Sequence, residues 1–419
     1  MAELDDRIRR YYAYHGVASF AIWIPFWTLW IRTHLETDFQ LTLVDAVFWA
    51  TMLVLQLPAG VISDKYSRKW SLFLGETCKF VGLLGYALGT TFLAYALANV
   101  VWAVGIVFLV SSDSSFLYDT LAEFGREDRF AAVKGRASLL DLVASAIGSL
   151  VGGFVVPALG GRLDLVIIVG AVIGMAGGTL TAVFRAPKFA RPWERAGSEQ
   201  VREGYRAVRT SPGLARIILF QVVLTTTFTS FSIFRSIYYT RVGIPESQLG
   251  LVWAGFLTVG GIAAAGSGWA ARRLGEARSM AALTVLVGLP LIGVFLARDA
   301  TPWVVALQVP MYIAFGLQTP LIATFINRRV DAARRATVLS LAAVVTVLAL
   351  LFVEPAVGWL SATVDIYAIG LALGLMQLVL GTAIVLWWLV AAPAFVPPVA
   401  ATGPSLWSRV AERFTRVRP

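Results

Sequence analysis

Twelve apolar stretches, each about 20 residues long, limit the folds that this chain can adopt. A helix of this length crosses the roughly 30 Å of hydrocarbon in a bilayer, because each residue adds about 1.5 Å. The stretches are 14–33, 43–63, 70–90, 93–119, 138–159, 163–185, 214–239, 248–271, 278–297, 302–326, 336–360 and 365–391. The sequence therefore predicts an all-α integral membrane protein with twelve transmembrane helices.

The composition agrees with a membrane protein and excludes several other classes. Hydrophobic residues make up 58% of the 419 residues and charged residues only 14%, whereas a soluble domain of this size exposes far more charge. Cys78 is the only cysteine, so neither a disulfide framework nor a cysteine-rich metal site is expected. The two histidines, His15 and His34, leave no zinc-protease motif and no Ser-His-Asp set deeper in the chain. We expect no metal, no cofactor and no enzymatic activity.

The net charge of +10 is concentrated in alternate loops. With the N-terminus placed in the cytoplasm, 29 of the 35 lysines and arginines lie in the termini and loops on the cytoplasmic side. This bias predicts a multi-pass protein of the cell (cytoplasmic) membrane with both termini in the cytoplasm. Topology and contact with the lipid bilayer therefore explain the basic charge, and no nucleic-acid partner is expected.

The longest polar stretch follows the sixth apolar segment and divides the chain into halves. We expect a six-helix bundle over 1–185, a cytoplasmic linker over 186–213 and a second six-helix bundle over 214–391. Within the linker, Glu194 to Arg209 is interpreted as an amphipathic helix, although a simple linker is sufficient to explain the stretch. Residues 392–419 form a basic cytoplasmic tail, either a helix on the membrane surface or a disordered segment.

Two short repeats indicate that the halves are related. A basic loop between the second and third segments contains Gly60, Asp64, Lys65, Arg68 and Lys69. A weaker copy 208 residues later contains Gly268, Arg272, Arg273 and Gly275. Residues 154–160 and 352–358 are also identical at five of seven positions, with chance similarity between apolar segments as the alternative. Repetition at half-chain spacing in a very hydrophobic chain points to a transporter made of two related bundles.

The first loop resembles the signature of the major facilitator superfamily, Gly-x-x-x-Asp-Arg/Lys-x-Gly-Arg/Lys-Arg/Lys. The resemblance implies the major facilitator fold, with twelve helices in two six-helix bundles that rock about a central cavity. It implies that Asp64 lies near the N-terminus of the eleventh helix and that Arg68 reaches Asp119, and that these contacts latch the outward-open state. Ser67 stands where the family has Gly, and Arg272 replaces the acid in the second loop, which we expect to latch less well.

A motif of small residues lies in the fifth apolar segment. It contains Ala144, Gly148, Ser149, Gly152, Gly153 and, four residues further on, Pro157. The motif resembles the antiporter signature Gly-x-x-x-Gly-Pro-x-x-Gly-Gly, with Ala144 for the first Gly and Ser149 for the Pro. Close helix packing by small residues explains it as well. The sequence around Asp119 also looks like drug/proton antiporter-like bacterial members of the superfamily.

Charged side chains inside apolar segments are costly, so each needs a partner or a task. Asp113 lies about 10 Å deep in the fourth segment, and Glu354 precedes Pro355 in the eleventh. Both are candidates for a proton carrier, with local polar packing as the alternative for Asp113. Arg235, in the seventh segment, has three interpretations: it binds an anionic group, pairs with Glu354 or reaches toward the interface.

The remaining membrane charges have simpler explanations. Glu76 and Lys79 are three residues apart on one helix and are expected to neutralise each other. Asp141 is expected to pair with basic loop residues. Asp45, near the outer end of the second segment, is expected to be solvated.

Uncharged candidates for the cavity are Trp27, Phe231 and Gln221, because the first and seventh helices line the cavity in the superfamily. An aromatic cavity with few charges suits amphiphilic or cationic substrates. The alternative is that these aromatic side chains face lipid or the interface.

The sequence therefore indicates a monomeric secondary transporter that binds a small-molecule substrate and protons. The first hypothesis is proton-driven efflux of small hydrophobic or cationic compounds by alternating access. The alternative is proton-coupled uptake of a nutrient or organic anion, with Arg235 holding the charge. No Gly-x-x-x-x-Gly-Lys-Ser/Thr loop is present, so an ATP-driven pump is not expected.

Overall fold

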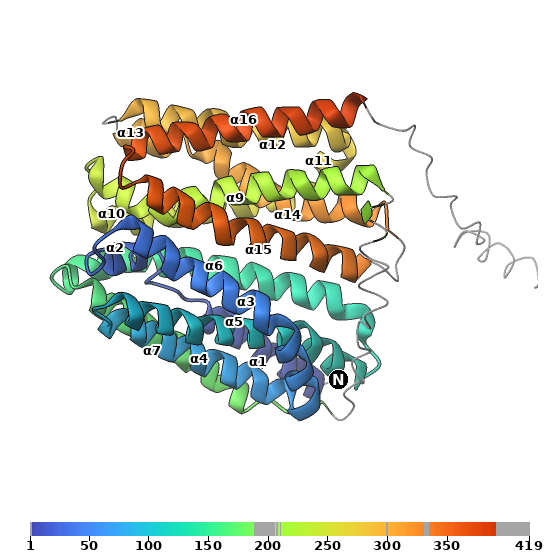
Figure 1. Ribbon diagram of the computed structural model, residues 1–419. Coiled ribbons are helices and arrows are strands. Elements are labelled where there is room, and N and C mark those ends of the chain that lie inside the picture. The colour runs from blue at the N-terminus through green and yellow to red at the C-terminus, as the bar shows by residue number, and fades with distance from the viewer. Residues whose placement is uncertain are drawn as a thin grey trace, which may run out of the picture.

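The structure is a computed structural model that describes residues 2–187, 206, 208–209, 211–298, 301–330 and 335–390. In these residues all regular elements are helices, as the sequence predicts (Figure 1). The first half contains α1 (Ala2–Ala18), α2 (Trp27–Arg32), α3 (Asp38–Tyr66), α4 (Arg68–Leu88), α5 (Phe92–Ala122), the short η1 (Glu127–Arg129), α6 (Phe130–Ala158) and α7 (Leu163–Ala182). The second half contains α9 (Pro212–Arg241), α10 (Glu246–Ala265), α11 (Ser267–Arg273), α12 (Gly275–Ala297), α13 (Thr301–Ala306), α14 (Val309–Asn327), α15 (Arg335–Leu360) and α16 (Ile366–Val390).

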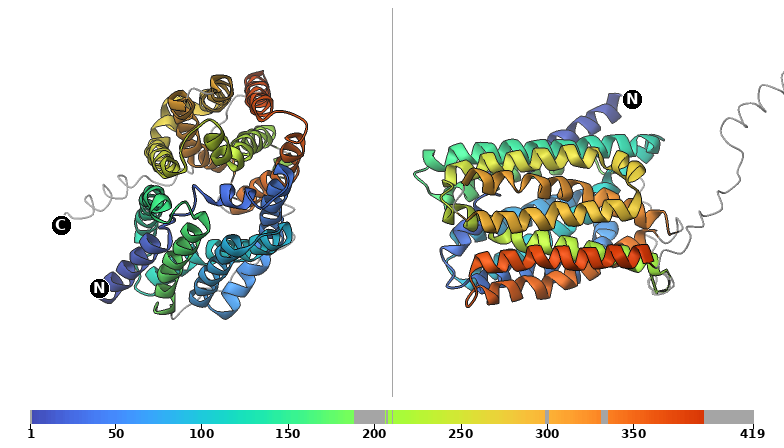
Figure 2. Two further views of the ribbon diagram at one scale, coloured as in Figure 1. Left: turned by 90° about the vertical axis from the view of Figure 1, so that its left-hand side faces the viewer. Right: turned by 90° about the horizontal axis from the view of Figure 1, so that it is seen from above.

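The helices form two bundles that lie side by side, seen end-on in the left view of Figure 2. The N-terminal bundle consists of α1 to α7 and the C-terminal bundle of α9 to α16. Eleven helices in the described part of the chain are long and apolar enough to cross a membrane. Most of the predicted linker helix and the whole of 392–419 lie outside the described residues.

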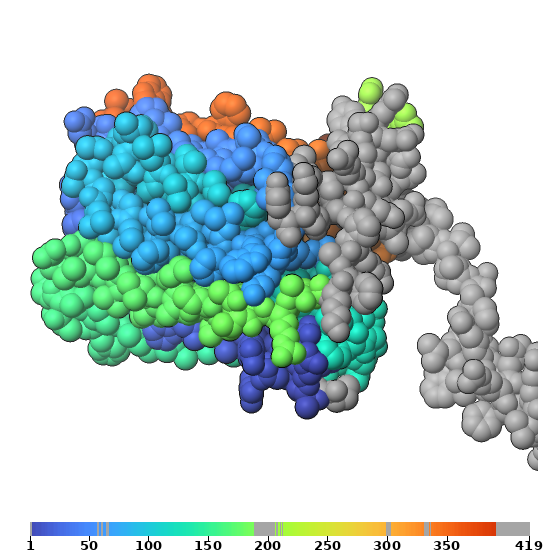
Figure 3. All heavy atoms as spheres, turned by 90° about the horizontal axis from the view of Figure 1, so that it is seen from below, coloured from blue at the N-terminus to red at the C-terminus, as the bar shows by residue number. Residues whose placement is uncertain are grey.

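The N-terminal bundle, one side of which is seen in Figure 3, has apolar side chains exposed on its surface. Val81 on α4, Leu97 on α5 and Val172 on α7 are among its exposed side chains. These apolar side chains are not buried inside the protein, and contact with lipid tails explains why they are apolar.

The first predicted span, 14–33, is not one helix, and this expectation is wrong. Helix α1 ends at Ala18, residues 19–26 form irregular turns, and α2 begins at Trp27. Pro25 lies in the irregular part; it lacks a backbone donor, and in a continuous helix its ring would clash with the preceding turn. Local turns replace the missing helical bonds, including Phe26 N to Trp23 O at 2.9 Å.

Glycines on neighbouring helices make room for this break. A Cβ atom on Gly148 of α6 would lie 2.7 Å from Ala21 N, and one on Gly170 of α7 would lie 2.6 Å from the Trp23 ring. Gly152, one turn after Gly148, contacts the carbonyl group of Ile22 in the same way. The small-residue motif of α6 therefore packs against the irregular backbone of residues 19–26. Non-helical backbone is tolerated within a membrane only where protein surrounds its polar groups, and this packing surrounds them.

The bundles meet mainly along two helix pairs, α6 with α10 and α3 with α15, and α2 also contacts α9. A Cβ atom on Gly250 of α10 would lie 2.7 Å from Gly153 N on α6, and one on Gly358 of α15 would lie 2.9 Å from Asp38 O on α3. All four residues lie near the helix ends that are predicted to face outward. The repeated segments 154–160 and 352–358 thus lie at corresponding ends of α6 and α15. Each of these helices packs against a helix of the other bundle.

Candidate binding site between the two bundles

A cavity of about 210 Å³ lies between the bundles, with walls from both of them. The N-terminal bundle contributes Trp27 of α2 and Asp45 and Trp49 of α3. The C-terminal bundle contributes Arg235 of α9 and Trp253 of α10. The cavity combines three indole rings with one acid and one base, which suits a small molecule with a flat or apolar part and a charged group.

Arg235 is the buried cation of this cavity, with 1% of its surface exposed. Its guanidinium group donates a hydrogen bond to the hydroxyl group of Tyr312, and its central carbon lies 3.8 Å from the centre of the Trp253 ring. Its Nε atom has no hydrogen-bond partner, and no carboxylate of the described chain forms an ion pair with it. The structure shows neither an ion pair between Arg235 and Glu354 nor an Arg235 side chain extended to the interface.

The structure brings two acids together at the edge of the same cavity. Glu354 of α15 is fully buried, and its carboxyl group interacts with that of Asp45 on α3. Asp45 also accepts a hydrogen bond of 3.0 Å from the Trp49 indole. Asp45 is half-buried rather than fully solvated, because α15 packs against α3 beside it while one side of the residue lines the cavity.

Asp113 lies elsewhere, inside the N-terminal bundle. It accepts hydrogen bonds from Tyr11 (2.8 Å) and His15 (3.2 Å) of α1 and forms an ion pair with Lys134 of α6. His15 also contacts Asp141 of α6 at 2.8 Å, so one ring links α1, α5 and α6. This arrangement favours the structural interpretation of Asp113, since cationic and donor groups already compensate its charge.

His15 and Asp141 were not identified as partners by the sequence. The two residues are 126 positions apart, and no local spacing relates them. The only available signal was the polar face of α1, where Tyr11, Tyr14 and His15 recur at helical spacing and are all buried. Glu76 and Lys79 behave as expected, with a contact of 2.6 Å within α4.

The first loop motif is partly described. Arg68, the first residue of α4, forms an ion pair with Asp119 of α5 and donates to Ser115 O at 3.1 Å. Lys69 lies over the Trp70 ring. Helix α3 runs through Gly60, Asp64 and Lys65, but the surroundings of Gly60 and the side chains of the other two lie outside what the structure describes.

The second loop motif forms the short connection between α10 and α12. Gly268, Arg272 and Arg273 lie in α11, and both arginines are exposed. Gly275 adopts a φ of 69°, a left-handed conformation that favours glycine. The nearby ion pair between Arg329 and Glu276, with two contacts of 2.5 Å, was not predicted.

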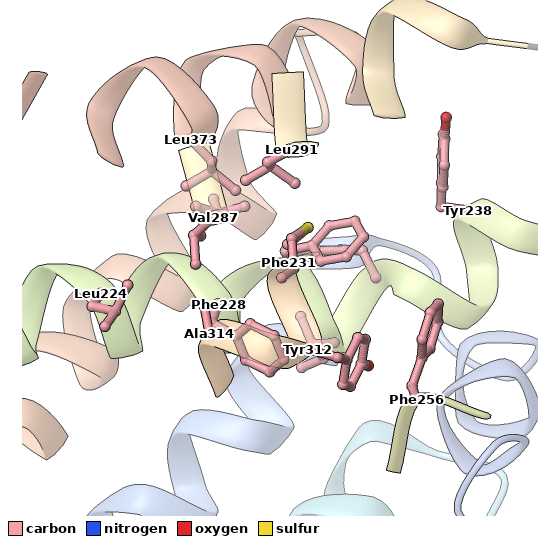
Figure 4. Close-up of a cluster of buried hydrophobic side chains, with 14 of the residues drawn as sticks. Leu224, Phe228, Phe231, Tyr238, Phe256, Val287, Leu291, Tyr312, Ala314 and Leu373 are labelled. Atoms are coloured by element: carbon pink, nitrogen blue, oxygen red, sulfur yellow. The ribbon is translucent and has the colours of Figure 1, made fainter. Parts of the chain in front are cut away.

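The other candidates are distributed over several places. Gln221 lines a separate hollow of about 100 Å³ in the C-terminal bundle together with Gln318. Phe231 does not line the cavity, because it points into the apolar core of that bundle and packs against Phe295 (Figure 4). Pro157 lies in the last turn of α6.

The sequence profile described as "Major Facilitator Superfamily" matches residues 13–353. A search of curated protein sequences finds no match to this chain. Among solved structures, a mutant of the nucleoside transporter NupG is 14% identical, with a TM-score of 0.76, over 91% of this chain and 98% of that chain. A bacterial homologue of the human lysosomal transporter Spinster, in an inward-facing and unoccupied conformation, is 16% identical, with a TM-score of 0.68, over 93% and 95% of the two chains.

Proposed function

Because the chain belongs to the major facilitator superfamily of transporters, we propose that it carries a small molecule with an anionic group through the cavity between its bundles. Transport occurs by alternating access and is coupled to protons. The observation that carries this proposal is Arg235, a buried guanidinium group in the cavity wall with no carboxylate partner in the described chain.

A buried cation without a counter-ion is costly, so Arg235 is a candidate binding site for a ligand that supplies the missing charge. Tyr312 and Trp253 hold the guanidinium group in place while leaving its Nε atom without a hydrogen-bond partner. Carboxylates and phosphates match the planar donor groups of arginine. The indole rings of Trp27, Trp49 and Trp253 provide stacking surfaces for the rest of the molecule.

A second candidate is efflux of hydrophobic or cationic compounds. The observation that favours it is the acid Asp45, which lines the cavity beside Trp49 and Trp27. Indole faces and a carboxylate together attract organic cations. The two candidates differ in which charged wall the substrate contacts, Arg235 or Asp45.

We place both termini in the cytoplasm, on the basis of the lysine and arginine bias between loops. The ion pair between Arg68 and Asp119 would then lie at the cytoplasmic ends of α4 and α5. We propose that it holds the basic loop for the latch role that the sequence motif implies. Both residues of the pair belong to the N-terminal bundle.

The proposal is tested in proteoliposomes that contain an internal pH dye. The probes are aromatic carboxylates, nucleosides, nucleoside monophosphates and tetraphenylphosphonium, each added under a proton gradient. An anion that moves together with protons supports the first function. Tetraphenylphosphonium that exchanges for protons, with no response to anions, supports the second function and overturns the first.

Arg235→Gln is the variant that tests the site. Removing one partner of a buried charge pair costs about 2–5 kcal/mol, so binding of the transported anion should weaken by about 30-fold or more. Arg241→Gln is the matched control, because Arg241 is exposed at the end of the same helix. Equal affinity in both variants, measured by quenching of tryptophan fluorescence, would exclude Arg235 as the anion site.

A further inference from the structure

We infer that Asp45 and Glu354 form a proton-binding site shared by the two bundles, and that loss of this proton separates their outward-facing ends. This inference deepens the proposed function by naming the groups that carry the coupling proton. The geometry of the acid pair and the first test below do not depend on the identity of the substrate.

The two carboxyl groups come from helices of different bundles that pack against each other, α3 and α15 (Figure 1). Each lies about 10 Å from the outward-facing end of its helix, since Asp45 is seven residues after Asp38 and Glu354 six before Leu360. The pair is therefore part of the contact that closes the bundles at this end.

Glu354 lacks the partners that a buried carboxylate needs. It is fully buried, and neither of its oxygen atoms has a hydrogen-bond partner in the described chain. Asp45 has Trp49 on one oxygen and faces Glu354. A single proton placed between the two carboxyl groups supplies the hydrogen bond that Glu354 lacks.

The surrounding groups do not neutralise two negative charges. Glu354 interacts with Asp45 and Trp49, and the Tyr86 side chain of α4 lies near Asp45. Arg235 of α9 shares the cavity, but its contacts are with Tyr312 and Trp253, and it forms no ion pair with either acid in the described chain. Two adjacent carboxylates in such surroundings cannot both ionise at low cost, so they retain one proton.

The proton state is linked to the arrangement of the bundles. While α3 and α15 are in contact, the pair is held together and keeps its proton. When the bundles separate at this end, each carboxyl group is hydrated and can ionise by itself. Ionisation therefore favours the separated arrangement, and protonation favours the closed one, because a ligand shifts a two-state equilibrium toward the state that binds it better.

Asp113, the other candidate proton carrier from the sequence, does not meet these conditions. All of its partners, Tyr11, His15 and Lys134, belong to the N-terminal bundle. A rocking motion of the bundles leaves these contacts unchanged. A proton on Asp113 is therefore not released by the motion that moves the substrate.

The test measures the distance between the bundles as a function of pH. Spin labels are attached at Thr90→Cys, between α4 and α5, and Thr363→Cys, between α15 and α16, on a Cys78→Ser background. Both positions are exposed and lie at the end of the molecule that carries the acid pair. Pulsed electron spin resonance of the full chain in lipid nanodiscs, without substrate, should show the long distance gaining population through one transition as pH rises.

Neutral, nearly isosteric variants test whether Asp45 and Glu354 are the groups that bind the proton. Glu354→Gln and Asp45→Asn should each keep the short distance at all pH values, because the remaining acid has a neutral neighbour. Asp365→Asn, in an exposed loop beside the labelled site, should keep the transition of the unsubstituted protein. A distance that does not depend on pH, or a transition that survives in Glu354→Gln, overturns the inference.

Two further measurements separate the possible failures. The first measurement adds sodium chloride or potassium chloride at high pH. If sodium chloride restores the short distance and potassium chloride does not, the site binds sodium, and the assignment to a proton is overturned. Loss of proton-driven flux in Glu354→Gln, with exchange of the same anion between both sides retained, is the expected result in proteoliposomes. Failure of the Arg235 experiment with an intact pH transition would remove the proposed substrate class and leave the proton site standing.

Discussion

The contact between α6 and α10 offers a direct test of how the bundles close. Gly250 and Gly153 face each other across this contact, and a Cβ atom on Gly250 would lie 2.7 Å from Gly153 N and 3.0 Å from Gly153 Cα. These are backbone atoms, which cannot rotate away as a flexible side chain can. Gly250→Ala therefore cannot be accommodated without moving the helices.

The required movement and its cost follow from these distances. Ordinary van der Waals contact begins near 3.4 Å, and the carbonyl oxygen of Ser149 lies even nearer to this Cβ atom than Gly153 N does, so the helices must separate by more than 0.7 Å at this point. Overpacking of this kind costs about 1–3 kcal/mol in a well-packed interior. The cost applies only in the arrangement in which α6 and α10 touch at this end, so the equilibrium should move toward the separated arrangement by roughly 5- to 150-fold.

The assay is the distance between labels at Thr90→Cys and Thr363→Cys, measured at one low pH where the unsubstituted protein is closed. Gly250→Ala should populate the long distance under these conditions. The gain in helix propensity from Gly to Ala, about 1 kcal/mol, stabilises α10 equally in both arrangements and does not change their ratio.

Gly255→Ala provides the matched control, because it lies on the same helix and a Cβ atom there meets nothing within 4 Å. It should leave the distance distribution unchanged. If Gly250→Ala and Gly255→Ala give the same distribution, the closeness of α6 and α10 does not set the closed state and the reasoning fails.

Two further predictions concern the N-terminal bundle. Arg68→Gln removes the cation next to the buried Asp119 carboxylate, so the solubilised protein should lose about 3–5 kcal/mol of stability and melt at a lower temperature. A melting temperature equal to that of the unsubstituted protein would show that the pair is not a structural element. His15→Asn removes a ring that bridges two carboxylates and should melt below His34→Asn, whose ring forms no ion pair in the described chain. The reverse order would contradict a structural role for the His15 network.

The fold could be predicted because its strongest determinant is local. An apolar stretch of sufficient length has to satisfy its own backbone groups in a bilayer and therefore becomes a helix. The break at 19–26 was not predictable in this way. Pro25 lies in the break, whereas Pro58 and Pro320 lie inside the continuous helices α3 and α14. Pro25 differs from these prolines in its tertiary contacts, because Gly148 leaves room for the irregular backbone and Gly170 leaves room for the Trp23 ring.

Of the candidate site, only the charged residues inside apolar segments could be predicted from the sequence. Arg235 and Glu354 could be selected from the sequence because a charge inside an apolar stretch requires a reason. Asp45 could not be selected, because it lies near a helix end where solvation is the simpler explanation. Its importance depends on the packing of α15 against α3, a contact between residues about 300 positions apart in the chain.

The shared cavity connects the charge of the substrate with the direction in which protons move. A cavity of about 210 Å³ is roughly 7 Å across, so an ion bound at one wall lies about that far from a charge in the opposite wall. At an effective dielectric constant of about 20, unit charges at this distance interact by about 2 kcal/mol, equivalent to between one and two pH units. An anion on Arg235 therefore favours the proton on Asp45 and Glu354, whereas an organic cation disfavours it.

Linkage makes this effect reciprocal, so an anion should bind together with the proton and a cation should displace it. The same cavity then supports symport of an anion or antiport of a cation, and the sign of the substrate charge decides between them. The pH transition of the labelled protein reports that sign. A transported anion should move the transition to higher pH, and tetraphenylphosphonium should move it to lower pH. A substrate that is transported with protons but leaves the transition in place would show that the coupling proton binds outside this cavity.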